Sequence, residues 1–179
     1  MHRGDTKTEL EQNHNDCYSW ALHCCNRNRE MASDVLQTSY VKMLEKQNTF
    51  RGGSVFKTWA FTIIKNTAID ALRKKKKEDR LIQSEDNFPD AGYETNLEDK
   101  PGQKLKELFF REALSQLSER QKEIMQLVFY HDLSLNETAE VLNISQGSVR
   151  KHYDRAKKFL AIWFQQHRLI TNNIYDGSI

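Results

Sequence analysis

The stretch LSLNETAEVLNISQGSVR, residues 133–150, decides the fold of this 179-residue chain. Ser134 is followed three positions later by Glu137, which is the capping box of a helix start. Ala139 and Leu142 lie on one face of that helix, where we expect them to be buried. The first half of the stretch therefore predicts a short amphipathic helix with a well-defined beginning.

A second helix follows after a turn of only a few residues. Asn143 tolerates the left-handed conformation of a tight turn, Ile144 is expected to be buried there, and Ser145 caps the next helix. On the inner face of that helix, Val149 locks it against the small Ala139. This arrangement is typical of a helix-turn-helix.

The outward face of the second helix, which we expect to end near Phe164, is polar and basic. Gln, Ser and Arg near a helix N-terminus hydrogen-bond base edges in the major groove, and later Lys and Arg hold phosphates. A generic exposed basic helix in an αα-hairpin is the alternative interpretation. The candidate DNA-binding residues are Ser145, Gln146, Ser148, Arg150, Lys151, His152, Arg155 and Lys158.

Three more helices are predicted upstream, at residues 16–27, 30–46 and 55–77. The third ends in a run of five cations, 73–77, which indicates phosphate contact or else a solvated face. The expected inward residues of the second helix are Met31, Val35, Tyr40, Val41 and Leu44. Those of the third are Phe56, Trp59, Ala60, Ile63, Ile64, Thr67, Ala68 and Leu72.

Cys17, Cys24 and Cys25 lie in the first of these helices. A metal or redox site with His14 or His23 is one interpretation, but the chain has no CxxC pair and an odd number of cysteines. Small apolar side chains in a helix core explain the pattern better. We therefore expect no metal and no cofactor, and a hydrolytic triad is also unsupported, because the chain has no Gly-x-Ser-x-Gly motif.

Charge is distributed in three blocks that the net charge of +2 conceals. Residues 1–77 hold 14 basic and 8 acidic residues, 78–103 hold 2 and 8, and 104–179 hold 11 and 9. The middle block, with Pro89 and Pro101, lacks periodicity and predicts a flexible acidic linker. Basic blocks on either side point to a polyanionic partner.

The rest of the chain completes an all-α prediction. Helices are expected at 104–117 and, after the capping box of Ser118 and Gln121, at 119–130. We predict two small helical domains, residues 14–77 and 104–166, joined by the linker 78–103. No segment approaches a membrane span and Met1 to Asn15 is too polar for a signal peptide, so we expect a cytoplasmic protein without membrane insertion.

Both halves together resemble bacterial RNA polymerase sigma factors of the sigma-70 family, in the small extracytoplasmic-function (ECF) group. The C-terminal half resembles region 4, which reads the −35 promoter element, at 117–124 (LSERQKEI), 133–139 (LSLNETA), 144–150 (ISQGSVR) and 155–156 (RA). The N-terminal half resembles region 2, which binds polymerase and the −10 element, at 34–37 (DVLQ), 50–52 (FRG), 56–59 (FKTW) and 64–70 (IKNTAID). The resemblance covers about 14–77 and 105–164.

The resemblance implies partners and site residues, and no catalytic residue, because the polymerase carries out the chemistry. Promoter DNA, the clamp of the largest polymerase subunit and the flap of the second-largest are the expected partners, with an anti-sigma factor as a further candidate. Polymerase contacts are implied for Asp34, Gln37, Val41 and Lys42. The −10 contacts are implied for Phe50, Arg51, Lys57, Trp59, Lys65, Asn66, Asp70, Arg73, Lys74, Lys75, Lys76 and Lys77. Trp59 is equally well explained as a core residue.

Some residues depart from the family pattern, and other functions stay open. Residues 38–40, Thr-Ser-Tyr, replace an acidic residue followed by apolar and aromatic ones, and Asn143 replaces a turn glycine. The leading hypothesis is a promoter-specificity subunit. The alternatives are a stand-alone helix-turn-helix regulator, which would need a dimerisation helix that the sequence does not show, and a polymerase-binding decoy that needs no DNA.

Overall fold

The computed structural model describes residues 6–46, 56–81 and 112–175, without the side chains of 80–81 and 168–175. Every regular element within these ranges is helical, so the all-α prediction is confirmed. None of the described helices is long and apolar enough to cross a membrane. The chain divides into two compact units. The first unit contains α1 to α4, and the second contains α6, η2, α8 and the first five residues of α7. Because most of α7 belongs to the second unit, the whole helix is described with it.

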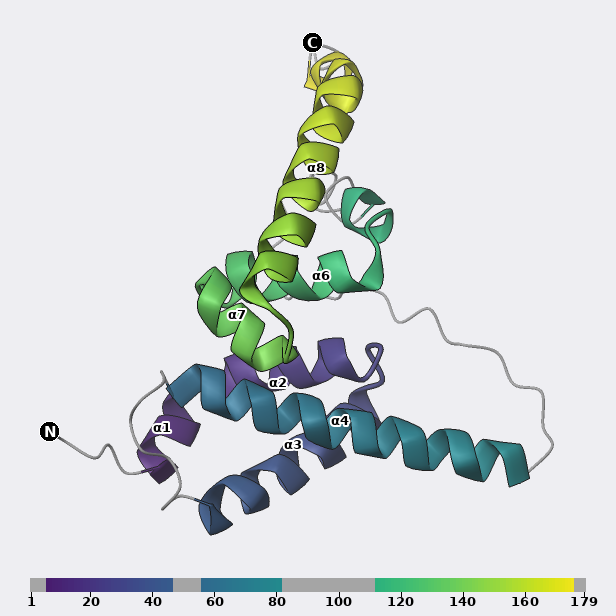
Figure 1. Cartoon of the computed structure of the whole chain (residues 1–179). Helices are drawn as coiled ribbons and strands as arrows, with labels where there is room; N and C mark the ends of the chain where they lie inside the picture. The colour runs from purple at the N-terminus through teal and green to yellow at the C-terminus, as the bar shows by residue number, and fades with distance from the viewer. Residues whose placement is uncertain (1–5, 47–55, 82–111, 176–179) are drawn as a thin grey trace, which may run out of the picture. The chain divides into compact units, whose positions relative to one another are not determined.

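The first unit is built on α2 (His14–Cys24), α3 (Arg29–Glu45) and α4 (Phe56–Leu81), which all pack on one another (Figure 1). A short helix, α1 (Thr6–Gln12), packs against α2 and α3. Sequence reasoning missed α1, because it buries only Thr6 and Leu10 and its composition is polar.

Helix α2 ends three residues before the predicted Arg27. Asn26 and Arg27 both take positive φ, 51° and 65°, and the Arg27 N–H donates to the Leu22 carbonyl at 2.8 Å. This left-handed turn satisfies a carbonyl at the helix end and redirects the chain into α3. Asn28 then caps α3, its side-chain oxygen accepting from the Met31 N–H at 2.9 Å.

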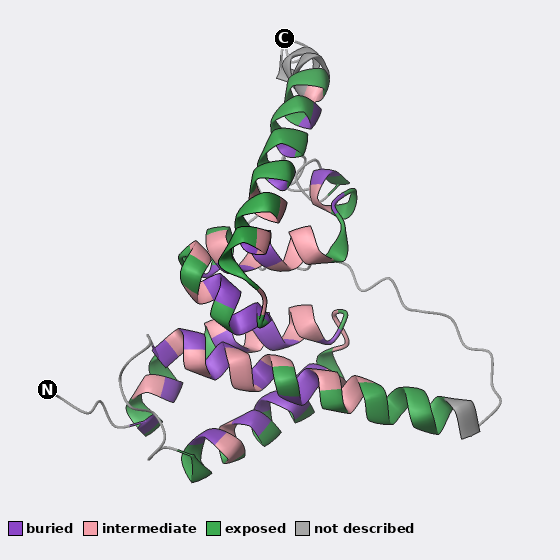
Figure 2. Ribbon diagram, viewed as in Figure 1, coloured by how far each residue is buried: buried purple, intermediate pink, exposed green. Residues whose placement is uncertain are grey.

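Trp20 of α2 is the centre of the first core, where it is fully buried. Its indole Nε1–H donates to the Phe61 carbonyl of α4 at 3.1 Å, and the two rings stack with centroids 5.7 Å apart. Indole is well placed in a core only when its N–H finds an acceptor. Buried residues line the facing sides of the three helices around it (Figure 2).

The predicted inward face of α3 is largely wrong. Of its five predicted residues only Val35 is buried, whereas Val41 is 56% and Leu44 is 44% exposed. A polar Ser39 on the true inner face concealed the period, and its hydroxyl is satisfied by donating to the Val35 carbonyl at 2.7 Å. The residues that α3 buries are Ala32, Val35, Leu36, Ser39 and Met43.

The inner face of α4 matches the prediction more closely. Trp59, Ile63 and Leu72 are half-buried rather than buried, and the fully buried Phe61 was missed. The other predicted residues, Phe56, Ala60, Ile64, Thr67 and Ala68, are buried.

Helix α4 also runs to Leu81, past the predicted end at Lys77 and into the range assigned to the linker. Lys74 and Glu78, one turn apart, lie 3.9 Å from each other and favour this continuation. Both linker prolines lie outside the described residues.

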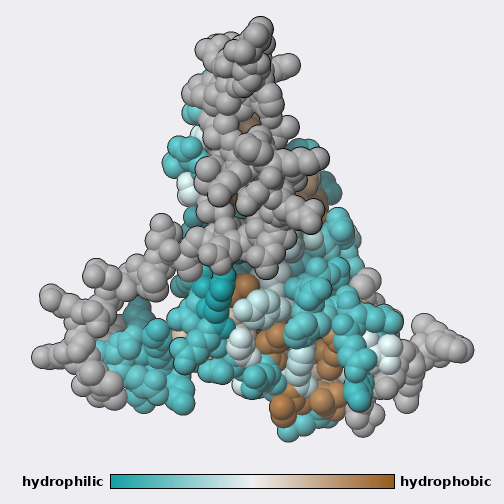
Figure 3. Space-filling view, turned by 180° about the vertical axis from the view of Figure 1, so that it is seen from behind, coloured by the Kyte–Doolittle hydropathy of each residue, from teal (hydrophilic) through white to brown (hydrophobic). Residues whose placement is uncertain are grey.

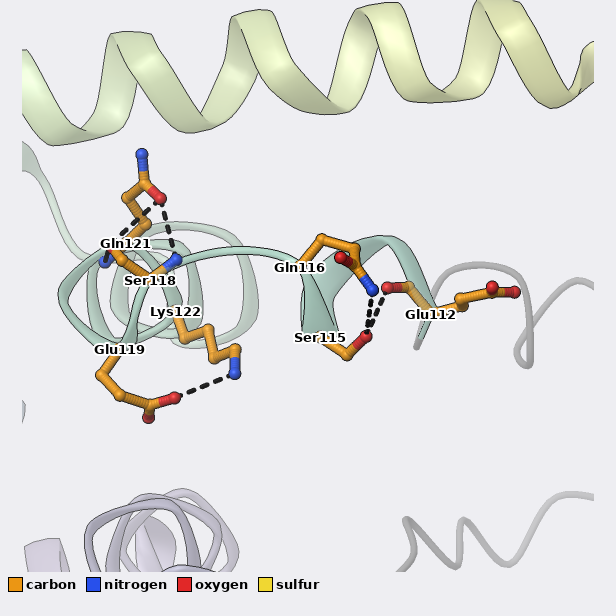
Figure 4. Close-up of polar contacts among 7 residues, drawn as sticks. All are labelled: Glu112, Ser115, Gln116, Ser118, Glu119, Gln121 and Lys122. Carbon is orange, nitrogen blue, oxygen red and sulfur yellow. Dashed lines mark hydrogen bonds and ion pairs between the residues drawn. The ribbon is translucent and has the colours of Figure 1, made fainter.

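The second unit begins, in the described residues, with a helical turn at 112–115. It continues with α6 (Glu119–Met125), the π-helical η2 (Gln126–Tyr130), α7 (Leu135–Leu142) and α8 (Gln146–Tyr175). The predicted capping box of α6 is present: the Ser118 N–H donates to Gln121 Oε1 at 2.9 Å, and the Gln121 N–H donates to Ser118 Oγ at 3.4 Å (Figure 4). Residues 104–111 lie outside the described range.

The end of the predicted 119–130 helix is π-helical. The His131 N–H donates to the Gln126 carbonyl five residues back, at 3.2 Å, and Asp132 then takes a φ of 57°. The wider turn leaves Phe129 and Tyr130 exposed and Val128 half-buried.

Helix α8 is longer than predicted and forms the second core. Its inner residues pack with residues 113, 117 and 125 in one hydrophobic cluster. The His167 ring stacks on Trp163 with centroids 3.9 Å apart, which extends the packing beyond the predicted end at Phe164, and the backbone is helical to Tyr175. The cluster consists of Ala113, Leu117, Met125, Ala156, Leu160 and Trp163.

Two buried threonines give a matched test of this packing. Thr138 Oγ1 is buried with no hydrogen-bond partner among the described residues. Thr67 Oγ1 accepts from Lys42 Nζ at 3.1 Å and donates to the Ile63 carbonyl at 2.9 Å. We expect Thr138→Val to raise the free energy of unfolding, and Thr67→Val to lower it, each by about 1 kcal/mol. Urea titration of both variants measures this, and an equal decrease in both would contradict the assignment.

Candidate nucleic-acid interface

The helix-turn-helix begins with the predicted cap of α7. The Ser134 N–H donates to Glu137 Oε2 at 2.8 Å, and the Glu137 N–H donates to Ser134 Oγ at 3.2 Å. Each side chain satisfies a backbone donor that the first turn of a helix leaves open. The start of α7 is thus fixed by two residues that sequence reasoning identified.

The turn between α7 and α8 takes the predicted conformation. Asn143 has a φ of 51°, and the Ile144 N–H donates to the Ala139 carbonyl at 3.1 Å, which closes the turn. Val149 is fully buried and Ala139 is 9% exposed, so both inner positions are confirmed. Ile144 is only half-buried, where we expected it to be buried.

The predicted base-reading face of α8 is largely open. Six of its eight residues are exposed, and Ser148 and His152 are half-buried. Ser145 and Ser148 also form the cap of α8: the Ser148 N–H donates to Ser145 Oγ at 3.2 Å, and the two hydroxyls are 2.9 Å apart. The exposed residues are Ser145, Gln146, Arg150, Lys151, Arg155 and Lys158.

Cations follow one side of α8 after this cap. Lys151, Arg155 and Lys158 recur at helical spacing, so their exposed side chains share a face. Sequence reasoning missed Lys157, which lies 5.3 Å above the Tyr153 ring. The Phe129 ring also stacks on the Tyr153 ring, with centroids 5.9 Å apart. Phe129 lies in the π-helical η2, for which the sequence carries no local signal.

Helix α4 carries a second candidate face. Trp59, Asn66, Asp70, Arg73 and Lys77 recur at spacings of seven, four, three and four residues, which places them on one side of the helix. All except the half-buried Trp59 are exposed, as is the whole run 73–77. The Trp59 ring lies 5.7 Å from that of Phe56. Phe50 and Arg51 lie outside the described residues.

Two lysines that were predicted to contact DNA or polymerase interact instead with side chains of neighbouring helices. Lys57 Nζ lies 2.6 Å from Asp16 Oδ2 of α2, and Lys42 Nζ of α3 donates to Thr67 Oγ1 of α4 at 3.1 Å. Both lysines are half-buried, as is Lys65. These interactions join α4 to its two neighbours.

The outer face of α3 mixes polar and apolar side chains. Asp34, Gln37, Val41 and Leu44 recur at spacings of three, four and three, and all four are exposed. Lys42 faces away from this row, toward α4. Hydrophobic residues gather on one side of the first unit, among hydrophilic ones (Figure 3). An exposed apolar patch rimmed by polar groups is typical of a protein-binding surface.

The cysteines are core residues. Cys17 and Cys25 are buried, Cys24 is half-buried, and none of the three is in a disulfide. Burial is the main cause that raises the pKa of Cys17 to about 12, and burial raises the pKa of Cys25 to about 11. Among the described residues no group of three His, Cys, Asp or Glu could hold a metal ion.

Each half of the chain matches a family model of known proteins. The Sigma-70 region 2 model matches residues 10–78 and the Sigma-70, region 4 model matches 113–160. The chain is 33% identical to RNA polymerase sigma factor SigV of Bacillus subtilis over 136 residues, 76% of this chain and 77% of that protein. It is 30% identical to the ECF RNA polymerase sigma-E factor of Haemophilus influenzae, covering 71% of each.

Solved structures share the fold. The sigma factor RpoE of Bartonella quintana, in complex with the anti-sigma factor NepR, superposes with a TM-score of 0.71 at 24% identity, over 89% of this chain and 96% of that one. CnrH, in complex with the cytosolic domain of CnrY, superposes with a TM-score of 0.58 at 17% identity, over 90% and 88%.

These findings define a two-part helical transcription factor of the sigma-70 type. The chain belongs to the sigma-70 family of RNA polymerase sigma factors, in its ECF group. It directs transcription initiation as a DNA-binding partner of core RNA polymerase and is not an enzyme.

The turn of the helix-turn-helix offers a direct test. Asn143→Val forces a β-branched residue into the left-handed region and should lower the free energy of unfolding by about 1 to 2 kcal/mol. Asn143→Gly accepts this φ without strain and should leave stability within about 0.5 kcal/mol. Thermal melts of both variants test this, and equal destabilisation would mean that the φ of residue 143 is not the constraint.

The thiols differ in accessibility and therefore in reactivity. Only a thiolate attacks a disulfide reagent, so the raised pKa and burial of Cys17 and Cys25 protect both at pH 8. We expect 5,5′-dithiobis(2-nitrobenzoate) to modify only the half-buried Cys24 quickly in the native protein, and all three thiols in urea. Mass spectrometry locates the label, and fast labelling of native Cys17 would contradict the structure.

Proposed function

We propose that this sigma factor selects promoters through two separate surfaces, α8 on the −35 element and α4 on the −10 element. Residues 104–166 form the −35 domain, 14–77 form the −10 and polymerase-binding domain, and 78–103 connect them. The cytoplasm is its place of action, because polymerase and promoter DNA are there. An anti-sigma factor is a candidate further partner, since the solved RpoE relative was crystallised with one.

The single observation that carries the −35 assignment is the arrangement around the turn. A capped α8 begins directly after a closed turn, and its first two turns expose Gln146, Arg150 and Lys151. Amide and guanidinium groups bind purine edges in the major groove, and a helix N-terminus favours phosphate. Lys151, Arg155 and Lys158, on one face, bind phosphates along the groove.

The −10 assignment is supported by the stripe on α4. A half-exposed Trp59 supplies a stacking surface for an unpaired base, and Asn66 and Asp70 supply polar edges. Arg73 to Lys77 continue the stripe and hold duplex phosphates upstream. Phe50 and Arg51 belong to the same proposal on the resemblance alone.

Polymerase binding is assigned to the exposed row of α3. Asp34, Gln37 and Val41 offer the mixed surface that suits the clamp of the largest subunit, and the exposed Leu44 extends it. The flap of the second-largest subunit is the expected partner of the −35 domain. A stand-alone regulator remains the second candidate, and it would bind duplex DNA tightly without polymerase.

Replacing Arg150 and Lys151 with Ala tests the −35 assignment. Both side chains are exposed, so the variant should fold normally and bind core polymerase as the wild type does. We expect promoter-dependent transcripts to fall by about tenfold or more, because a bidentate hydrogen-bond pair to a base edge is worth about 1 to 3 kcal/mol. Run-off transcription and core-binding titration measure the two effects.

Two results, one from that experiment and one from DNA binding by the wild-type protein alone, would count against the proposal. Unchanged promoter use would favour a polymerase-binding decoy, and tight operator binding without polymerase would favour a stand-alone regulator. Replacing the exposed Glu119 and the half-buried Lys122 of α6 with Gln serves as the matched control, since this ion pair of 2.9 Å lies outside the proposed surface.

The lysine run predicts a change in salt dependence. Neutralising Lys75 and Lys76 with Gln should reduce the slope of log K against log salt by roughly 0.9 for each duplex phosphate that the protein no longer binds. Promoter binding by the holoenzyme, measured from about 50 to 200 mM salt, gives the slope. An unchanged slope would mean that residues 73–77 form a solvated helix face that does not contact phosphates.

A further inference from the structure

Lys57 lies on the inner side of α4, away from the stripe proposed to face DNA. Lys57, Phe61, Ile64 and Ala68 recur at spacings of four, three and four residues, and the last three are fully buried. Trp59 and Asn66 lie on the other side of the helix. A cation at this position needs a counter-charge within the protein.

Asp16 supplies that charge across the seam between α2 and α4. Its Oδ2 lies 2.6 Å from Lys57 Nζ, and the Lys57 and Asp16 side chains are only 23% and 34% exposed. A lysine in the first turn of a helix is also opposed by the helix dipole, whereas Asp16 lies in the first turn of α2, where a negative charge is favoured. The pair therefore keeps Lys57 inside the unit.

We infer that Asp16 is a positioning residue for the −10 surface: through Lys57 it fixes the first turn of α4, and with it the Trp59 ring. This inference rests on the proposed function. It assigns Lys57 to the residues that support the −10 surface, and no longer to those that contact DNA. Trp59 follows Lys57 by two residues and is braced by Phe56 at 5.7 Å, so a rotation of this turn moves the stacking surface directly. Lys57 of the salt bridge, the Phe56–Trp59 ring pair and the buried Thr58 all lie in this first turn of α4.

The charge swap Asp16→Lys with Lys57→Asp separates positioning from phosphate binding. Asp16→Asn and Lys57→Gln should each lower promoter opening by about two- to fivefold, the coupling expected of a half-exposed ion pair. Their combination should be no worse than either alone. The swap restores a pair and should recover opening to within about twofold of wild type, although an aspartate at 57 would repel DNA.

Promoter opening is followed by 2-aminopurine fluorescence in the −10 region with saturating holoenzyme, well below the melting temperature of each variant. Core affinity and circular dichroism are measured in parallel. The swap of Glu119 and Lys122 in α6 is the matched control and should change nothing. Lys57→Arg keeps the cation and should behave as wild type.

The salt slope of promoter binding is the second readout, and it does not require the swap to fold. Lys57→Gln should leave the slope unchanged, and a fall of about 0.9 would show direct phosphate binding and overturn the inference. A folded swap that opens no better than the single variants would overturn it as well. If wild-type holoenzyme itself opens no promoter, the proposed function fails instead.

Discussion

The reversal of the chain at Asn143 is the constraint on which the DNA-reading half depends. With a φ of 51° there and the Ile144 N–H bonded to the Ala139 carbonyl, α8 must begin at Gln146. Val149 then falls inside and Arg150 and Lys151 fall outside. A slip of one residue in the turn would rotate α8 by about 100° and bury the cations. The proposed recognition surface is thus a consequence of the backbone geometry at one position.

The first unit solves a different problem, because it has to hold one long helix in a fixed rotation. Trp20 bonds and stacks on Phe61, Lys42 bonds to Thr67, and Asp16 pairs with Lys57. These three interactions connect α2 and α3 to successive positions along α4. With the inner side so fixed, the stripe from Trp59 to Lys77 is presented outward as one surface.

Local signals in the sequence predicted the parts of the fold that depend on local chemistry. The capping boxes at Ser118 and Ser134 and the left-handed turn at Asn143 form within a few residues, so they could be read directly. The inner face of α3 could not, because Ser39 is polar yet satisfies itself by bonding to its own helix.

The interaction partners of the charged side chains could not be predicted from the sequence either. Which cation faces DNA and which faces another helix depends on the packing of α2, α3 and α4, and Lys42 and Lys57 look like any other exposed lysine in the chain. The length of α8 was also underestimated, since the helix runs to Tyr175, past the predicted end near Phe164. The π-helical turn before the helix-turn-helix has no sequence signature at all.

Run-off transcription with core RNA polymerase on genomic DNA of the same cell tests the central claim most directly. The account predicts discrete transcripts that require both this protein and core polymerase, each starting downstream of a −35 and a −10 element. Absence of any promoter-dependent transcript on every genomic fragment, with folded protein that binds core polymerase, would contradict it.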